Sequence, residues 1–220
     1  MRSDNNTKTK ILDSAEKLFA IKGFAGTSIR TIVHEADVNI AAIHYHFGSK
    51  EALLEAVLQR RLAPVNEERL SLLDRHQAAH PSGPLPLEGV IEAFVAPMVR
   101  MRFNPLHDGD LFPRLLGRSR IEGDQHILAT VHSVLEPVIE RFTAAFAHAL
   151  PHLVREELLW RMHCMIGVIS FTMIIPKDGD AMTNDAIDLN DPEALIRRLT
   201  AFTAAGMRGA EARPAGRENE

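Results

Sequence analysis

The sequence predicts an all-α protein with an N-terminal three-helix helix-turn-helix domain and a larger helical C-terminal domain. Three observations support this fold class. Apolar residues recur at spacings of three and four along most of the chain. No run alternates apolar and polar residues for long enough to make a convincing strand. Near the N-terminus, two short helical segments are separated by about three residues, which is typical of a helix-turn-helix.

Composition and charge narrow the class of protein. The chain has 220 residues, of which 45% are hydrophobic and 25% charged, as in ordinary globular proteins. Residues 1–62 carry nine basic and seven acidic side chains, so only this end is basic in a chain of net charge −4. The longest apolar stretch, Cys164 to Ile175, has 12 residues, too few for a membrane span. With one cysteine and a polar start, we expect a cytoplasmic protein without disulfides or a membrane partner.

The first two helices follow from one-sided apolar patterns. The first pattern ends at Gly23 and Gly26 and consists of Ile11, Ala15, Leu18 and Phe19. Thr27 or Ser28 is a good N-cap for the second helix. Its predicted inner face is made of Ile29, Ile32, Val33 and Ala36. The segment Asp37-Val38-Asn39 then forms a short turn.

The third helix is the critical element. It runs from Ile40 to Phe47, and its predicted inner face holds only Ile40, Ile43 and Phe47. Because so short a helix is unstable alone, the neighbouring helices must hold it and leave its outer face free to enter a groove. Gly48 stops it, and Ser49 caps a fourth helix. The outer face displays Ala41, Ala42, His44, Tyr45 and His46.

The stretch from Ile11 to Val57 resembles the TetR family of bacterial transcriptional regulators. The most specific part is the aromatic–His–Phe triplet Tyr45-His46-Phe47, which is followed by Gly48-Ser49-Lys50-Glu51-Ala52-Leu53. The resemblance implies a DNA-binding domain over residues 1–50 and a ligand-binding and dimerisation domain over 51–209. The polar composition of residues 210–220 predicts a mobile tail. The segments 62–75 and 112–117 resemble a subgroup of fatty-acid-responsive repressors.

The resemblance also implies which residues contact DNA, where phosphate contacts set register and base contacts set sequence choice. The phosphate candidates are Ser28, Tyr45, His46 and Lys50. The base-edge candidates are Arg30, Asn39, Ile40, Ala41 and Ala42. Family members usually carry an aromatic residue where this chain has His44, which can also donate to a phosphate. Plainer interpretations stay open, namely a solvated Arg30, a core Tyr45, and alanines that only favour helix.

The C-terminal domain offers a candidate ligand pocket with an apolar wall. The predicted wall is Met98, Met101, Phe103, Phe112, Leu116, Leu135, Phe142, Met162, Met165 and Phe171, and Leu115, Val131 and Val138 extend the same pattern. Arg120, with Arg114, Arg118, Arg161 and His163, supplies polar groups near it. Pro64, Pro97, Pro113 and Pro137 predict kinks or boundaries that can leave a cavity. An ordinary Met- and Phe-rich core and solvated arginines are the alternatives.

Two long apolar segments, 155–175 and 191–207, close the chain. The first is apolar on nearly every side, which predicts a fully buried helix. So much apolar surface needs covering, and the resemblance implies that both segments pair with those of a second subunit. A two-fold dimer would place its two recognition helices, the third helix of each subunit, about 34–36 Å apart on a near-palindromic operator.

These patterns favour a dimeric DNA-binding regulator, a repressor released by a small apolar or acyl-type effector such as a fatty acid or acyl-CoA. No phosphate-binding loop, hydrolase elbow or zinc-protease motif is present, so we expect no enzyme, cofactor or metal site. The alternative is a helical small-molecule-binding protein or enzyme whose N-terminal helices only support the fold.

Overall fold

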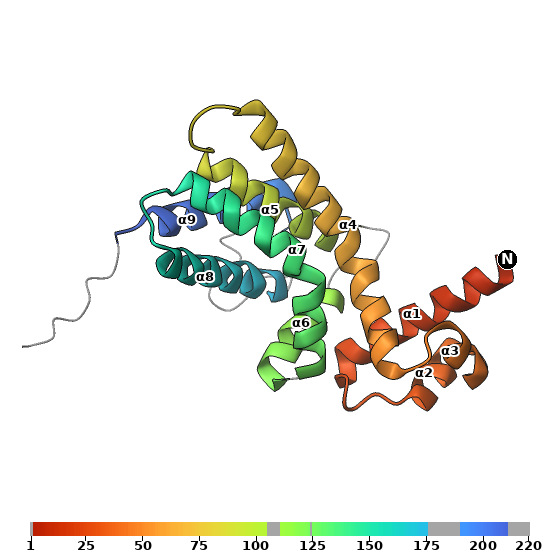
Figure 1. Ribbon diagram of the computed structural model, residues 1–220. Coiled ribbons are helices and arrows are strands. Elements are labelled where there is room, and N and C mark those ends of the chain that lie inside the picture. The colour runs from red at the N-terminus through yellow and green to blue at the C-terminus, as the bar shows by residue number, and fades with distance from the viewer. Residues whose placement is uncertain (1, 105–110, 124, 176–189, 211–220) are drawn as a thin grey trace, which may run out of the picture.

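The computed structural model describes residues 2–104, 111–123, 125–175 and 190–210, and within them the chain is all α-helical, as predicted. It contains α1 (Arg2–Lys22), α2 (Ile29–Ala36), α3 (Ile40–His46), α4 (Lys50–Ala79), α5 (Leu87–Arg102), α6 (Leu111–Glu122), α7 (Gln125–Ala149), α8 (Arg155–Ile174) and α9 (Pro192–Arg208). Figure 1 shows α1–α3 gathered at one end of the molecule and α5, α7, α8 and α9 at the other. The mobile tail expected after residue 210 lies outside the described residues.

Local side-chain caps fix the starts of the short helices. Ser28 accepts a hydrogen bond from the Thr31 amide at 3.1 Å, and Asn39 accepts one from the Ala41 amide at 2.9 Å. Ser49 likewise caps α4. Between α2 and α3, Asp37 adopts a left-handed conformation with φ 51°, which ends α2 and turns the chain sharply. These caps set the bounds of α2 and α3 close to those expected from the sequence.

Two apolar cores hold the fold together. One joins α5 to α7, α8, α9 and the C-terminal half of α4. The other contains the inner faces of α1–α3 and the first half of α4, and it also includes Phe112 and Leu115 of α6 and Val131 of α7. Because α6 packs directly against α1, the N-terminal helices share a continuous core with part of the C-terminal domain.

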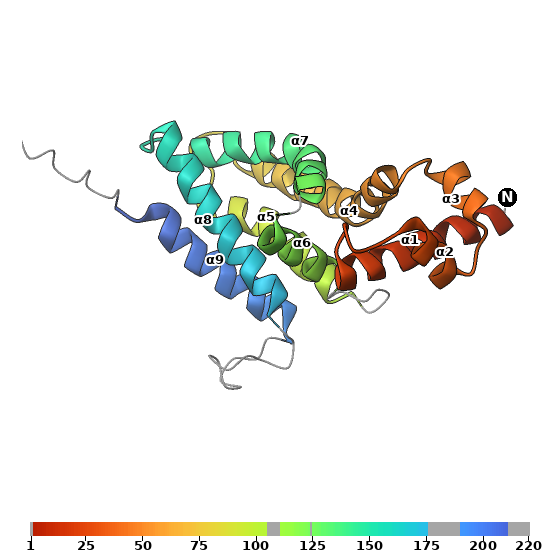
Figure 2. The same cartoon turned by 90° about the horizontal axis from the view of Figure 1, so that it is seen from below.

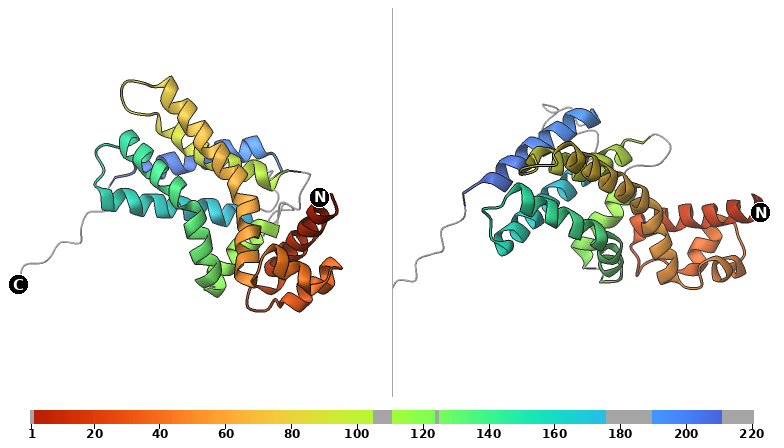
Figure 3. Two further views of the ribbon diagram at one scale, coloured as in Figure 1. Left: turned by 45° about the vertical axis from the view of Figure 1, so that its right-hand side comes forward. Right: turned by 45° about the horizontal axis from the view of Figure 1, so that its top comes forward.

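The helix α4 connects the two ends of the molecule (Figure 3). It begins at Lys50, the last residue of the N-terminal domain as delimited from the sequence, and continues through Pro64 to Ala79. Its first half packs on α1–α3, through Leu53, Leu54 and Val57, and its second half packs on α5 and α7. A single rigid element therefore passes through both domains. Pro97 and Pro137 likewise lie inside α5 and α7 and are not helix boundaries.

The prediction that the apolar helix now seen as α8 is buried on all sides is wrong for the single chain. Trp160 is 61% exposed and Phe171 is 63% exposed. Helix α8 packs on α9, α6, α7 and α5, and among the described residues no further layer of helices covers its opposite face. Figure 2 shows α8 and α9 side by side at the end of the molecule remote from α1–α3.

Candidate nucleic-acid interface and internal cavity

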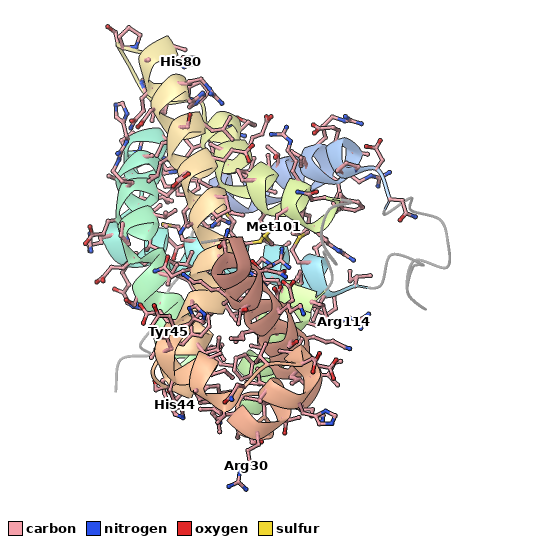
Figure 4. All side chains as sticks on the ribbon, turned by 90° about the vertical axis from the view of Figure 1, so that its right-hand side faces the viewer. Arg30, His44, Tyr45, His80, Met101 and Arg114 are labelled. Carbon is pink, nitrogen blue, oxygen red and sulfur yellow. The ribbon has the colours of Figure 1, made fainter. Side chains whose placement is uncertain are left out.

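The outer face of α3 is bare. Ile43 points inward and is fully buried, whereas Ala41, His44 and Tyr45 are exposed, Tyr45 to 79%. In Figure 4, Arg30, His44 and Tyr45 lie at the end of the molecule opposite His80. This exposure excludes the interpretation of Tyr45 as a core aromatic in the single chain. A seven-residue helix that is anchored mainly by one buried side chain and bare on its other side is free to enter a DNA groove.

The start of α3 meets α2 in a shallow cleft. Arg30 is exposed on the first turn of α2 and lines this cleft together with Val33, Val38 and Ile40. Ile40 is 44% exposed, so its expected place on the inner face of the third helix is wrong. The cause is its position on the first turn of α3, where the helix emerges from the turn. Ala42 packs against the N-terminal core and is half-buried, which leaves Ala41 as the more accessible of the two alanines.

The polar groups around α3 are already oriented by the fold. The Asn39 side-chain oxygen is used for the cap of α3, so its amide nitrogen is the group left for a base edge. A ring nitrogen of His44, Nδ1, lies 3.1 Å from the Gly48 carbonyl, which favours the tautomer protonated there. The His46 ring packs edge-on against Tyr45, with ring centroids 5.0 Å apart. These contacts restrict the side chains before any DNA is bound.

Lys50, which the sequence predicts as a phosphate contact, is also bonded within the chain. Its ammonium donates to the carbonyls of Phe24 at 3.0 Å and of Thr27 at 3.1 Å, and it lies 4.1 Å from the centre of the Phe24 ring. Two of its three N–H groups are therefore used within the chain. The fold draws this side chain inward because the turn between α1 and α2 leaves carbonyls without helical partners. Lys50 therefore links α4 to that turn, and its contact with a DNA phosphate stays a prediction.

A buried ion-pair network joins α1 to α4 and was not anticipated from the sequence. The Glu16 side chain is 1% exposed, and its two oxygens accept from Arg60 at 2.6 Å and Arg61 at 2.7 Å. Arg60 also bonds the exposed Asp13. A charged residue at position 16, beside the apolar positions Ala15 and Phe19, was the available signal. The network links α1 to α4, the helices before and after the pair α2 and α3.

The C-terminal domain contains a mostly apolar cavity of about 260 Å³ between α4, α5, α6, α7 and α8. Its wall comprises Leu62, Arg69, Phe94, Met98, Phe112, Pro113, Leu116, Gly117, Ile127, Leu128, Val131, His132, Leu135, Val138, Ile139, Ile166, Ile169, Ser170 and Met173. Phe112 and Leu116 belong to α6, the helix that also packs on α1. The cavity thus adjoins the element that contacts the N-terminal helices.

The residues proposed for the pocket wall divide into two sets. Those that line the cavity are Met98, Phe112, Leu116 and Leu135. Those that do not line it are Met101, Phe103, Phe142, Met162, Met165 and Phe171. Phe142 and Met162 are buried core residues that point elsewhere, and Phe171 lies on the outer face of α8. Helical spacing identifies apolar faces but not the element each face meets, which explains the division.

The arginines expected near the pocket are placed differently. Arg161 is 7% exposed and donates to Glu157 at 2.6 Å and to the Met207 carbonyl at 2.7 Å, so its partners come from the protein. Arg114 is exposed, and the side chain of Arg120 lies outside the described residues. Arg69 of α4 lines the cavity instead. It occurs within the apolar stripe of α4, which was the sequence signal for it.

The outer face of α8 and α9 is strongly apolar. Its exposed side chains include Leu159, Trp160 and Phe171 of α8 and Phe202 of α9, each at least 41% exposed. By length and composition alone, α8 would suffice to cross a membrane, with 33% of its apolar window buried in the chain. Contiguous apolar surface of this kind marks a contact surface.

Comparison with known proteins places this architecture in a family. A model described as "Tetracyclin repressor-like, C-terminal domain" matches residues 92–206, and one described as "Bacterial regulatory proteins, tetR family" matches residues 11–57. The fold and the exposed α3 define a helix-turn-helix protein with a helical C-terminal domain. The two matches together span most of the chain, and the chain belongs to the TetR family of bacterial regulatory proteins.

Relatives in sequence match only part of the chain. The chain is 54% identical over 50 residues to the probable HTH-type transcriptional regulator YttP of Bacillus subtilis, covering 23% of this chain and 24% of that one. It is 40% identical over 78 residues to the HTH-type transcriptional repressor NicS of Pseudomonas putida, covering 34% of this chain and 37% of that one. The matched segment spans between about a quarter and two-fifths of these relatives.

Similar solved structures extend over nearly the whole chain. The fatty acid degradation regulator FadR of Bacillus halodurans superposes with a TM-score of 0.64 at 14% identity, covering 93% of this chain and 97% of that one. A TetR-family transcriptional regulator from Bordetella parapertussis also gives 0.64, at 18% identity, covering 93% and 98%. At these identities the likeness concerns the fold.

Proposed function

We propose that the protein is a ligand-responsive, dimeric transcriptional repressor that binds a near-palindromic DNA operator through α3. The bare face of α3, opposite the fully buried Ile43, is the observation that carries this proposal. The relatives in sequence are named as transcriptional regulators or repressors, and the tetR-family model matches residues 11–57, which include α3.

On DNA, Arg30 and the first turn of α3 would meet base edges, since residues near the N-terminus of a recognition helix are the ones that reach them. Arg30 suits guanine because its guanidinium donates two parallel hydrogen bonds to O6 and N7. Ala41 allows close approach of the backbone. Tyr45, His46 and Ser28 would donate to phosphates, with Ser28 held at the cap of α2.

A second copy of the chain is the proposed cover for the apolar outer face of α8 and α9. Burying Trp160, Phe171 and Phe202 in a two-fold interface would remove large apolar side chains from water. The face lies remote from α3, so pairing through it leaves both recognition helices free (Figure 2). Both α3 helices would then face the same DNA duplex one helical turn apart.

The effector would bind in the internal cavity, and α6 would transmit its presence. Phe112 and Leu116 line the cavity on one side, while α6 contacts α1 on the other. A ligand that displaces α6 must therefore disturb the packing of α1 on α6 or shift α4. Helix α4 is affected because it passes through both apolar cores. Because coupling between two binding sites is reciprocal, effector and operator would weaken each other's binding by the same factor.

An apolar or acyl-type effector is favoured by the mostly apolar cavity wall. One structural neighbour is named as a fatty acid degradation regulator, which supports a fatty acid or acyl-CoA as the class to test first. A small-molecule-binding protein or enzyme with purely structural N-terminal helices is the competing function. That competing function gives no reason for the outer face of α3 to be exposed to solvent.

The test is operator binding by the full-length protein. DNA fragments from around its own gene are selected by mobility shift, and the binding site is mapped by footprinting and titrated with salt. We expect a two-fold symmetric footprint and an affinity that falls steeply with salt. Arg30→Ala should relax the sequence preference, while Arg155→Ala, at the remote end of α8, should leave it unchanged. Absence of any footprint on genomic DNA would refute the proposal.

A further inference from the structure

The cavity contains one cationic group that has no acidic partner. Arg69 is 3% exposed and lines the cavity wall. Its guanidinium donates to the Phe94 carbonyl at 2.8 Å and to the Asn66 side-chain oxygen at 3.4 Å, and it lies 4.2 Å from the centre of the Phe94 ring. Among the described residues, no carboxylate forms an ion pair with it. Each partner it has is electrically neutral.

An unpaired buried cation is costly, and the protein has not removed the charge. Burial lowers the pKa of Arg69 to about 10, which still leaves the guanidinium charged at neutral pH. The buried arginine of α8, Arg161, is by contrast neutralised by Glu157. Since buried charges are normally paired, the missing anion at Arg69 is the feature to explain. The group lies in the wall of a cavity, where a bound molecule can supply that anion.

We infer that the cavity binds a small amphipathic carboxylic acid whose carboxylate pairs with Arg69 and whose hydrocarbon body fills the space towards α6 and α8. This inference rests on the proposed ligand-responsive function and specifies the chemical class of the effector. The fork of a guanidinium matches a carboxylate with two parallel hydrogen bonds. The rest of the wall, including Phe112, Leu135 and Ile169, offers apolar contact to the body of the ligand.

The geometry favours the free acid over its thioester. A thioester carbonyl carries no charge and would leave Arg69 unpaired, and the bulky coenzyme would have to lie outside the cavity. The volume of the cavity limits the length of the ligand. An apolar cavity of about 150 Å³ can hold benzene, so one of about 260 Å³ has room for the longer hydrocarbon body of a medium-chain acid.

The experiment measures binding of octanoate, 1-octanol and octanoyl-CoA to the full-length protein by calorimetry, without DNA. Octanoate should bind most tightly, and Arg69→Gln should weaken it roughly 10- to 100-fold while leaving octanol within about twofold. Glutamine can still donate to the Phe94 carbonyl, which protects the fold, and circular dichroism verifies it. The matched control is Arg75→Gln, because Arg75 is an exposed arginine of α4 that does not line the cavity. It should bind octanoate as the unaltered protein does.

The outcomes separate this inference from the proposed function. Octanol binding as tightly as octanoate, octanoyl-CoA binding more tightly than octanoate, or undiminished octanoate binding by a folded Arg69→Gln would each overturn it. A parallel titration of operator-bound protein with octanoate, followed by fluorescence anisotropy, tests the coupling to DNA. Octanoate that binds at Arg69 but never releases DNA would leave the acid site standing and overturn the effector role.

Discussion

Replacing Lys50 by methionine separates two roles for this side chain. Lys50→Met keeps the apolar stem but removes the ammonium that donates to the Phe24 and Thr27 carbonyls. Two hydrogen bonds from a charged donor contribute about 1.5–3 kcal/mol each when fully desolvated. Lys50 is half-buried, so we expect a combined loss of about 2–4 kcal/mol of folding free energy, including its contact with the Phe24 ring. Urea denaturation at fixed protein concentration measures this loss.

The salt dependence of operator binding distinguishes this structural role of Lys50 from a phosphate contact. Each phosphate contact contributes about 0.9 to the slope of log affinity against log salt, so losing one per protomer would reduce the slope by about 1.8 in a dimer. If the role of Lys50 is purely structural, Lys50→Met leaves the slope unchanged and lowers the folding free energy. Lys22→Met is the control, since Lys22 is an exposed lysine at the end of α1. Unaltered stability together with a slope lowered by about 1.8 would refute a structural role for Lys50 and support a phosphate contact.

Three other changes test the remaining features. Tyr45→Phe removes only a hydroxyl from a side chain that is 79% exposed, so it should leave stability unchanged and weaken operator binding about tenfold or more in anisotropy titrations; equal affinity would remove Tyr45 from the phosphate contacts. Glu16→Leu should cost about 2–4 kcal/mol in urea denaturation because it strands two arginines, whereas Asp13→Asn, at an exposed carboxylate, should cost under about 1 kcal/mol. Trp160→Asp should convert the dimer to a monomer in analytical ultracentrifugation, whereas Ile21→Asp, also at an exposed apolar position, should not. A Trp160→Asp protein that stays dimeric would exclude the outer face of α8 and α9 as the interface.

Features that depend on residues near one another in sequence were predictable. The sequence predicts Ser49 and either Thr27 or Ser28 as caps because an N-cap bonds an amide only two or three residues away, and the structure confirms Ser49 and selects Ser28. The all-helical class followed from apolar spacing within each segment. The inward position of Ile43 and the bare side of α3 followed from the same periodicity, applied to a helix too short to stand alone.

Features that depend on contacts across the chain were decided by tertiary packing. Whether Phe112 or Phe142 lines the cavity depends on which neighbouring helix each faces, and both satisfy the same spacing rule. Lys50 turned inward because the carbonyls of Thr27 and Phe24, 23 and 26 residues earlier, lie in a turn outside the helices, where they can accept from its ammonium.

Patterns within single segments were sufficient to predict the all-helical class, the cap at Ser49 and the inward position of Ile43, since each rests on bonds or spacings within a few residues. Only the tertiary structure decided the pairing of Glu16 with two arginines and the isolation of Arg69 inside a cavity. The physical reason is that the cost of burying a charge depends on which groups from distant segments surround it, and helical periodicity carries no information about them.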